Sequence, residues 1–109
     1  MSFKIDTTRR FKKELKELAK KYKKIKIDYS NLLDSLEQNP TLGTPLGNNC
    51  YKVRVANSSV STGKSGGFRV ITLLKVEKEK IILLTIYSKS EKETISDDEL
   101  KAILKECNI

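Results

Sequence analysis

The sequence contains no histidine, no tryptophan and two cysteines, and aromatic residues make up 6% of its 109 residues. Without histidine, a Ser-His-Asp or Cys-His triad, histidine acid–base catalysis and histidine ligation of a metal are all excluded. Cys50 and Cys107 alone are too few ligands for a structural zinc site. We therefore expect neither a metal nor another cofactor.

A secretion signal and a long apolar run are also missing. The first ten residues, MSFKIDTTRR, contain no apolar segment of the kind found in signal peptides. The longest apolar run, Ile81–Leu84, is far shorter than the roughly 20 residues of a membrane helix. We expect a cytoplasmic protein with reduced thiols, no membrane partner and a single domain over residues 1–109.

Positive charge is concentrated in one stretch of the chain. The net charge is +8, and residues 9–26 alone carry that excess, with basic residues opposed by Glu14 and Glu17. Such a stretch indicates contact with a polyanion or an acidic protein, although a solvated helix face is the simpler alternative. The candidate RNA- or ribosome-binding residues in it are Arg9, Arg10, Lys12, Lys13, Lys16 and Lys20.

Hydrophobic periodicity divides the first half into a short strand and two helices. Residues 3–6 alternate as a strand, and Thr7 or Thr8 is placed to cap the helix that follows. After a connection at residues 23–27, Asp28 is expected to cap a second helix that ends before Pro40. Residues 40–49 are loop by composition. The two apolar stripes are Phe11, Leu15, Leu18, Ala19 and Tyr22, then Tyr29, Leu32, Leu33 and Leu36.

The second half is predicted to be a sheet followed by a helix. Strands are expected at residues 51–56, 68–76 and 81–88, with a hairpin turn at residues 77–80. Ser96 and Glu99 form a capping box that opens a last helix. The order β-α-α-β-β-β-α, with a small antiparallel sheet packed against an N-terminal helical hairpin, predicts an α+β fold.

Basic and phenolic side chains are predicted to meet at one end of this sheet. If Val76 pairs with Ile81, Arg69 lies opposite Ser88 in the hairpin. A slip of one residue would change the face but not the end of the sheet. The residues expected at this end are Arg54, Lys64, Arg69, Tyr87 and Lys89.

Such a cluster suits cleavage of RNA by attack of a 2′-hydroxyl on the adjacent phosphate. Fixed cations stabilise the extra charge of the transition state, and Arg69 has the forked geometry that holds two phosphate oxygens. Lysine or tyrosine must then carry the protons, and neighbouring guanidinium groups are expected to lower one of their pKa values from about 10. The alternative is structural: an ion pair for Arg54 and a half-buried strand end for Tyr87.

Three motifs follow one another in this half. They are K-x-R-V-A at Lys52–Ala56, G-K-x-G-G-x-R-V at Gly63–Val70 and L-x-x-Y-x-K-x-E at Leu84–Glu91. Their order and spacing resemble the RelE/HigB group of bacterial toxins, within the RelE/ParE superfamily. The helical hairpin before the motifs and the helix after them fit the same RelE-like fold.

The resemblance implies the toxin of a type II toxin–antitoxin pair, a metal-independent endoribonuclease that cuts mRNA in the ribosomal A site and inhibits translation. It implies that the five residues at the sheet end are catalytic, with Lys52 as a secondary RNA contact. The implied partners are the 70S ribosome with its mRNA and a cognate antitoxin, expected to be a helix-turn-helix protein. Some relatives carry arginine where this chain has Ser90, and tyrosine or histidine near the C-terminus, so the general base stays open.

Two other functions stay open at this point. A ParE-like toxin would inhibit DNA gyrase without nuclease chemistry, although the clustered arginines and lysines favour the nuclease. A non-catalytic RNA- or protein-binding module would use the basic stretch at residues 9–26 as a surface that follows phosphates.

Overall fold

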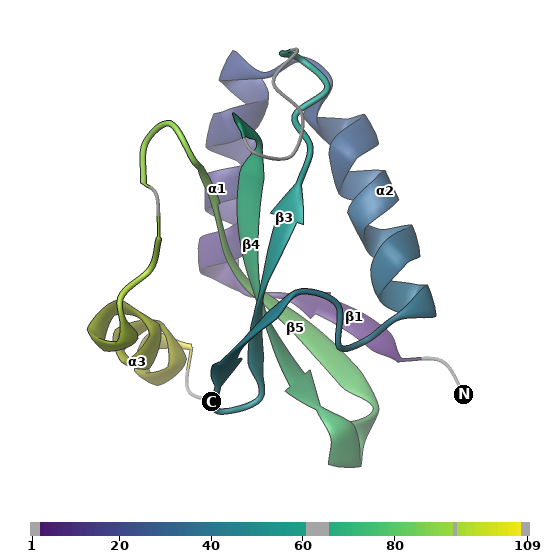
Figure 1. Cartoon of the computed structure of the whole chain (residues 1–109), viewed down its shortest axis with the longest axis vertical. Coiled ribbons are helices and arrows are strands. Elements are labelled where there is room, and N and C mark those ends of the chain that lie inside the picture. Colours follow the sequence, from purple (N-terminus) through teal and green to yellow (C-terminus); the bar gives the residue numbers. More distant parts are fainter. Residues whose placement is uncertain (1–2, 61–65, 93, 108–109) are drawn as a thin grey trace.

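The computed structural model describes residues 3–60, 66–92 and 94–107. Along this part of the chain, a short strand and two helices come first, and further strands and a last helix follow (Figure 1). Their order is β1 (Lys4–Thr7), α1 (Arg9–Lys21), α2 (Ile25–Gln38), β2 (Thr44–Gly47), β3 (Cys50–Val55), β4 (Phe68–Lys75), the 3-10 turn η2 (Val76–Lys78), β5 (Lys80–Ser88) and α3 (Asp97–Glu106). Within the described ranges, every helix is too short or too polar to span a bilayer.

The five strands form one sheet in the order β1-β5-β4-β3-β2. β1 runs parallel to β5, and every other neighbouring pair is antiparallel. The helical hairpin packs on one face of the sheet and α3 packs on the other (Figure 1). This arrangement confirms the predicted α+β class, with a sheet packed against an N-terminal helical hairpin.

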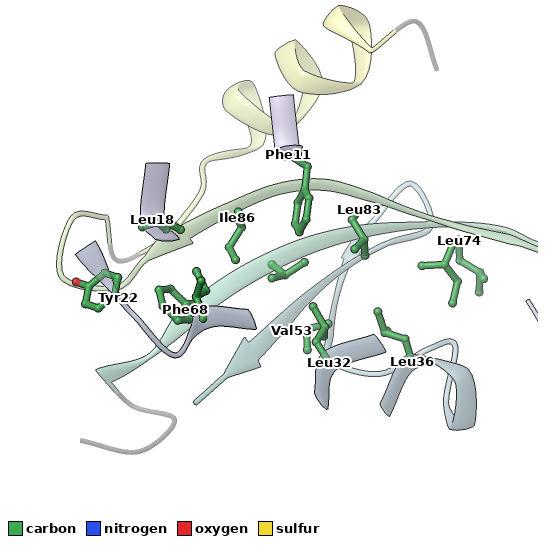
Figure 2. Close-up of a cluster of buried hydrophobic side chains, with 13 residues drawn as sticks. Phe11, Leu18, Tyr22, Leu32, Leu36, Val53, Phe68, Leu74, Leu83 and Ile86 are labelled. Carbon is green, nitrogen blue, oxygen red and sulfur yellow. The ribbon is translucent and has the colours of Figure 1, made fainter. Parts of the chain in front are cut away.

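Each face of the sheet has its own hydrophobic cluster. Under α1 and α2, side chains such as Phe11, Leu36 and Phe68 are fully buried (Figure 2). Under α3, Ile71 and Leu84 of the sheet meet apolar residues of the helix. The second face of the sheet is therefore covered as well.

Two of the three predicted N-caps form as expected. The Thr8 hydroxyl oxygen accepts a hydrogen bond from the Phe11 backbone amide at 3.0 Å, and the same hydroxyl donates to the Leu84 carbonyl at 2.9 Å. Thr8 therefore caps α1 and also ties its start to β5. Ser96 accepts from the Glu99 backbone amide at 3.1 Å and caps α3.

The loop predicted at residues 40–49 contains a strand, so that prediction is wrong in its second half. β2 pairs antiparallel with β3 across a two-residue turn, in which Asn48 and Asn49 have φ of 54° and 61°. Asparagine tolerates this left-handed conformation, which matches the twist of a two-residue hairpin. The strand was not predicted because it has four residues and contains Pro45, and proline occurs in strands only at the edge of a sheet.

The second helix starts earlier than predicted, and Asp28 is not its cap. α2 begins at Ile25, which is 2% exposed and belongs to the core. Asp28 lies in the first turn, is 4% exposed and accepts a hydrogen bond from the Ser58 backbone amide at 3.0 Å. Its carboxylate therefore fixes α2 to the segment that follows β3.

The register of the β4–β5 hairpin differs from the prediction, by two residues next to the turn and by one residue beyond a bulge. The 3-10 turn and a left-handed Glu79, with φ of 49°, make Lys75 pair with Lys80. A bulge then occurs where Ile71 pairs with Thr85, and Arg69 consequently lies opposite Tyr87 instead of Ser88. The slip changes which side chains share a face, and the end of the sheet is unchanged.

Glu14 of α1 stabilises the strand next to this bulge. β1 covers the outer edge of β5 only as far as Leu83. Beyond that point the Glu14 carboxylate accepts hydrogen bonds from the Thr85 hydroxyl at 2.6 Å and from the Ile86 backbone amide at 3.3 Å. A helix side chain therefore satisfies a backbone donor that would otherwise face the strand edge.

Candidate functional site

Three polar side chains form one row across an end of the sheet. Arg54 of β3 lies directly opposite Arg69 of β4, which lies opposite Tyr87 of β5. Residues paired in this way project from the same face with their Cβ atoms about 5 Å apart. The face is the one that α3 covers, because Tyr87 packs in the cluster beneath that helix.

Arg69 is the buried cation of the row. Its side chain is 3% exposed, and its Nη1 donates a hydrogen bond to the Phe68 carbonyl at 3.1 Å. Burial, followed by repulsion from Arg54, lowers the pKa of Arg69. Arginine nevertheless stays charged at neutral pH. A buried guanidinium next to an exposed one creates a local preference for an anion.

Tyr87 lies beside Arg69 but keeps its proton. Burial is the main cause that raises the pKa of Tyr87, Glu99 raises it further, and Arg69 opposes both. Arg69 thus acts in the expected direction, but burial outweighs it, and the expected net lowering of the pKa does not occur for Tyr87. Its hydroxyl oxygen is buried and has no hydrogen-bond partner in the part of the chain that the structure describes. The protonated phenol is therefore available to donate a hydrogen bond or a proton to a bound ligand.

Lys92 belongs to the same site, although sequence reasoning gave it no role. Its Nζ lies 5.4 Å from the centre of the Tyr87 ring and forms an ion pair with Glu99 in the first turn of α3. That ion pair lowers the pKa of Glu99. The pair connects the segment after β5 to α3 above Tyr87. Spacing alone gave no signal, since Lys92 follows the strand in an irregular segment.

Lys89 lies at the same end of the sheet, held there through its backbone. Its amide donates to the Gly67 carbonyl at 3.0 Å, and its side chain is half-buried. Gly67 has a steric role in this arrangement, because a Cβ there would lie 2.0 Å from the Val55 carbonyl oxygen. The glycine of the second motif thus permits the start of β4 to lie against the end of β3.

The other predicted catalytic and RNA-binding residues are placed as follows. Lys64 lies outside the described residues. Lys52 shares the face of Arg54, two positions earlier on β3, and is half-buried.

The basic stretch is separate from the row. Exposed side chains on α1 include Arg9, Lys12, Lys13, Lys16 and Lys20. Arg10 differs from them, because it forms ion pairs with Glu14 at 3.4 Å and with Glu106 at 3.1 Å. α1 packs on the opposite face of the sheet from the row. The structure therefore brings Arg54, Arg69, Tyr87 and Lys89 to one end of the sheet and leaves the helix cations on another surface.

Tyr22 is a second phenol near this end of the sheet, on the other face. It follows α1 and packs edge-on against Phe68 at 5.3 Å (Figure 2). Hydrogen bonding with Ser88 and then Ser90 lowers the pKa of Tyr22, and Lys21 acts in the same direction. Sequence reasoning placed Tyr22 in an apolar stripe and missed its polar partners, which come from a segment far along the chain.

The row combines two cations that can hold an anion with a phenol that can supply a proton. Among the described residues, no three His, Cys, Asp or Glu side chains come together as metal ligands. Comparison with known proteins adds a family. The family described as "RelE toxin of RelE / RelB toxin-antitoxin system" matches residues 8–108, which is nearly the whole chain. The chain belongs to the RelE toxin family.

Solved RelE structures share the fold at low sequence identity. A doubly substituted Escherichia coli RelE in the free state is 17% identical, with 99% of this chain and 96% of that chain covered and a TM-score of 0.61. The toxin in the intact E. coli RelBE toxin–antitoxin complex is 18% identical, with coverage of 77% and 93% and a TM-score of 0.57. Isolated E. coli RelE is 17% identical, with coverage of 94% and 97% and a TM-score of 0.51. The search of curated proteins returns no matching sequence.

Proposed function

We propose that this RelE-family toxin is a ribosome-dependent endoribonuclease that cuts mRNA and thereby inhibits translation. The observation that supports the proposal is the row of Arg54, Arg69 and Tyr87. Two adjacent guanidinium groups beside a protonated phenol match the needs of phosphodiester cleavage, which requires charge stabilisation and a proton donor.

In the proposed reaction, the 2′-hydroxyl of one nucleotide attacks its 3′-phosphate. The new O–P bond forms as the bond to the 5′-oxygen of the next nucleotide breaks, leaving a 2′,3′-cyclic phosphate and a 5′-hydroxyl. Arg69 and Arg54 hold the phosphate oxygens and stabilise the extra negative charge. Tyr87, whose pKa is raised, gives its proton to the leaving 5′-oxygen. A lysine, Lys64 or Lys89, accepts the proton of the 2′-hydroxyl.

RNA can reach the whole row only if the elements that bury Arg69 and Tyr87 move. Arg69 is 3% exposed and Tyr87 is 7% exposed, while Arg54 is open to solvent. RNA therefore meets Arg54 first. Contact with the other two side chains requires α3 and the segment that carries Lys92 to shift. The exposed Lys92–Glu99 ion pair is a weak restraint on that shift, because surface ion pairs contribute about 0–1 kcal/mol.

The proposed partners follow from the charges. The exposed lysines of α1 supply a phosphate-binding surface separate from the row, which suits ribosomal RNA. A relative, E. coli RelE, is solved in a toxin–antitoxin complex, which supports a cognate antitoxin for this chain. We expect that antitoxin to be a helix-turn-helix protein. The ribosome as a target places the activity in the cytoplasm.

Primer extension on a defined mRNA tests the proposal. The protein is incubated with the mRNA, with and without translating 70S ribosomes. Cuts spaced by codons are expected in the presence of ribosomes. Arg54→Ala is expected to lower the cleavage rate at least about 100-fold, because it removes a donor to the transition state. Lys78→Ala is the matched control, since it removes an exposed positive charge at the opposite end of the sheet.

Each of three outcomes would contradict a part of the proposal. If Arg54→Ala cut mRNA at the full rate, the row would not be the catalytic site. If cleavage were equally strong without ribosomes, the activity would not depend on the ribosome. An absence of cuts together with inhibition of gyrase in a supercoiling assay would establish the ParE-like alternative. Arg69→Lys, checked for folding by circular dichroism, serves as a second variant because Arg69→Ala empties a buried position.

A further inference from the structure

The chain turns back directly after β5, and Lys89 lies in that turn. The Ser88 carbonyl accepts hydrogen bonds from the backbone amides of Glu91 at 3.0 Å and Lys92 at 3.1 Å. The Ser90 amide donates to the Ser88 hydroxyl oxygen at 3.3 Å, and the two serine hydroxyls share a hydrogen bond at 2.8 Å. The turn is therefore organised by the two serines that flank Lys89.

A side chain from the N-terminal half of the chain contacts both serines. Ser88 is 2% exposed and pairs with Phe68 of β4, so its side chain lies on the face that α1 covers. Tyr22, at the C-cap of α1, packs edge-on against the same Phe68 and directs its hydroxyl towards the segment that follows β5 (Figure 2). That hydroxyl forms hydrogen bonds with the side chains of Ser88 and Ser90.

Tyr22 is itself held firmly, because it joins the two helices of the hairpin. Its backbone amide donates to the Leu18 carbonyl at 2.8 Å, and its carbonyl accepts from the Ile25 amide at 3.3 Å. The residue is 9% exposed and belongs to the hydrophobic cluster under α1 and α2. A side chain that packing has already ordered loses little further entropy when its hydroxyl binds a turn. The Tyr22 hydroxyl is therefore a fixed point against which the turn can be held.

Lys89 is the catalytic candidate that this contact reaches. Its amide donates to the Gly67 carbonyl at 3.0 Å, so the pairing of β4 with β5 continues for one residue beyond Ser88. Strand alternation then directs the Lys89 side chain to the face of Tyr87, two positions earlier. A serine that is bonded to Tyr22 stands on each side of Lys89. The contact therefore fixes the backbone that carries the amine.

We propose that Tyr22 is a positioning residue for RNA cleavage, because its hydroxyl, acting through the two serines, holds the Lys89 amine at the end of the row. There the amine accepts the proton of the attacking 2′-hydroxyl. The inference rests on the proposed nuclease function, and it chooses Lys89 over Lys64 as the proton acceptor. A proton acceptor needs support of this kind, since small errors in its position slow the reaction.

The position of Tyr22 separates this role from direct catalysis. Tyr22 belongs to the cluster under α1 and α2, whereas Tyr87 belongs to the cluster under α3. The sheet lies between the two phenols, so the Tyr22 hydroxyl does not reach RNA bound at the row. Any effect of that hydroxyl on cleavage must therefore pass through the turn.

Tyr22→Phe tests the proposal, because it removes the hydroxyl and keeps the ring on Phe68. We expect kcat for ribosome-bound mRNA to fall about tenfold and KM to stay within about twofold, since the cations that bind RNA are unchanged. Tyr29→Phe is the matched control. Tyr29 packs its ring near Phe11 at 5.8 Å in the same cluster, and burial is the cause that raises its pKa. Both kinetic constants should keep their parent values in that control, and circular dichroism checks the folding of each variant.

Two further measurements show whether Tyr22 acts through Lys89. Lys89→Met removes the amine and is expected to lower kcat. Adding Tyr22→Phe to Lys89→Met should change the rate less than about twofold, because residues that act as a unit are not additive. Hydrogen exchange of the Lys89 amide is independent of activity, and Tyr22→Phe should speed it at least about tenfold.

Four results would overturn the inference. They are a parent-like kcat in Tyr22→Phe, a parent-like kcat in Lys89→Met, an equal loss in Tyr29→Phe, and a further tenfold loss when Tyr22→Phe is added to Lys89→Met. With any of these, the parent enzyme still cuts mRNA and the proposed function stands. If the parent does not cut at all, the exchange measurement decides. Faster exchange of the Lys89 amide in Tyr22→Phe would keep the hold on the turn and refute the proposed function alone, whereas unchanged exchange would refute both.

Discussion

The two faces of the sheet differ in what they bury. The face under α1 and α2 is mainly apolar, and its buried polar groups are the hydroxyls of Tyr22, Thr72 and Ser88. The face under α3 has a smaller cluster that includes Cys50 and Tyr87, and Arg69 is buried in the adjoining row. Burial raises the pKa of the Cys50 thiol to about 11.

The face under α1 and α2 therefore contributes most of the folding stability, and the face under α3 carries the proposed reaction centre. Burying a charge or an unpaired hydroxyl costs free energy, so a face that carries Arg69 and Tyr87 contributes less to folding than an apolar face of equal area. The helical hairpin supplies the missing stability from the other side. Changes to the first face should therefore unfold the whole protein, and changes to the second should loosen α3 or alter activity.

The largest effect is expected in the helical-hairpin face. Phe11→Ala removes a ring that is fully buried, and we expect it to lower the free energy of unfolding by about 3–5 kcal/mol. Ile103→Ala, in the α3 face, should increase hydrogen exchange in α3 more than it lowers global stability. Urea unfolding with exchange measurements compares the two. An equal global loss from both variants would contradict the separation.

A smaller effect is expected at the helix caps. Ser96→Ala should cost about 1 kcal/mol of α3 stability, since it removes one bond to the Glu99 amide. Thr8→Ala should cost more, because Thr8 also donates to the Leu84 carbonyl and so joins α1 to β5. Thermal unfolding of both variants measures the order. If Ser96→Ala were the more damaging change, the α3 face would be the one that holds the fold.

The smallest effect is a difference in tyrosine titration. Tyr22→Phe should remove a phenol that ionises below its ordinary pKa, and Tyr87→Phe one that ionises above it. The fold favours neutral Tyr87, so its contribution to stability is complete below about pH 10 and is lost as pH rises through the raised pKa. Tyr22 has the opposite sign: its contribution is present at high pH and is lost as pH falls through the lowered pKa. Absorbance at alkaline pH, read against the parent, checks both.

The order of elements could be predicted because it depends on local patterns. The apolar stripes, the Thr8 and Ser96 caps and the alternation in the long strands all express backbone preferences within a few residues. β2 escaped prediction because four residues that include Pro45 carry too little pattern. Asp28 was misplaced because its partner, the Ser58 amide, comes from a distant segment.

The site could be predicted in position but not in detail. The end of the sheet and the presence of Arg54 and Arg69 follow from strand directions alone. The pairing of Arg69 with Tyr87 depends on the conformation of Glu79 and on a bulge, and neither leaves a mark in the sequence. The raised pKa of Tyr87 depends on the packing of α3, and the lowered pKa of Tyr22 depends on Ser88 and Ser90.

The parallel pairing of β1 with β5 has a consequence for synthesis. β5 lies between the first strand and the rest of the sheet, although it is the last of the described strands to be made. Until Ser88 has left the exit tunnel, a nascent chain has no central strand on which β1 can pair, and Arg69 has no Tyr87 opposite it. Chains released early thus lack the core and the proposed reaction centre together, so a truncated product is harmless for the same reason that it is unfolded.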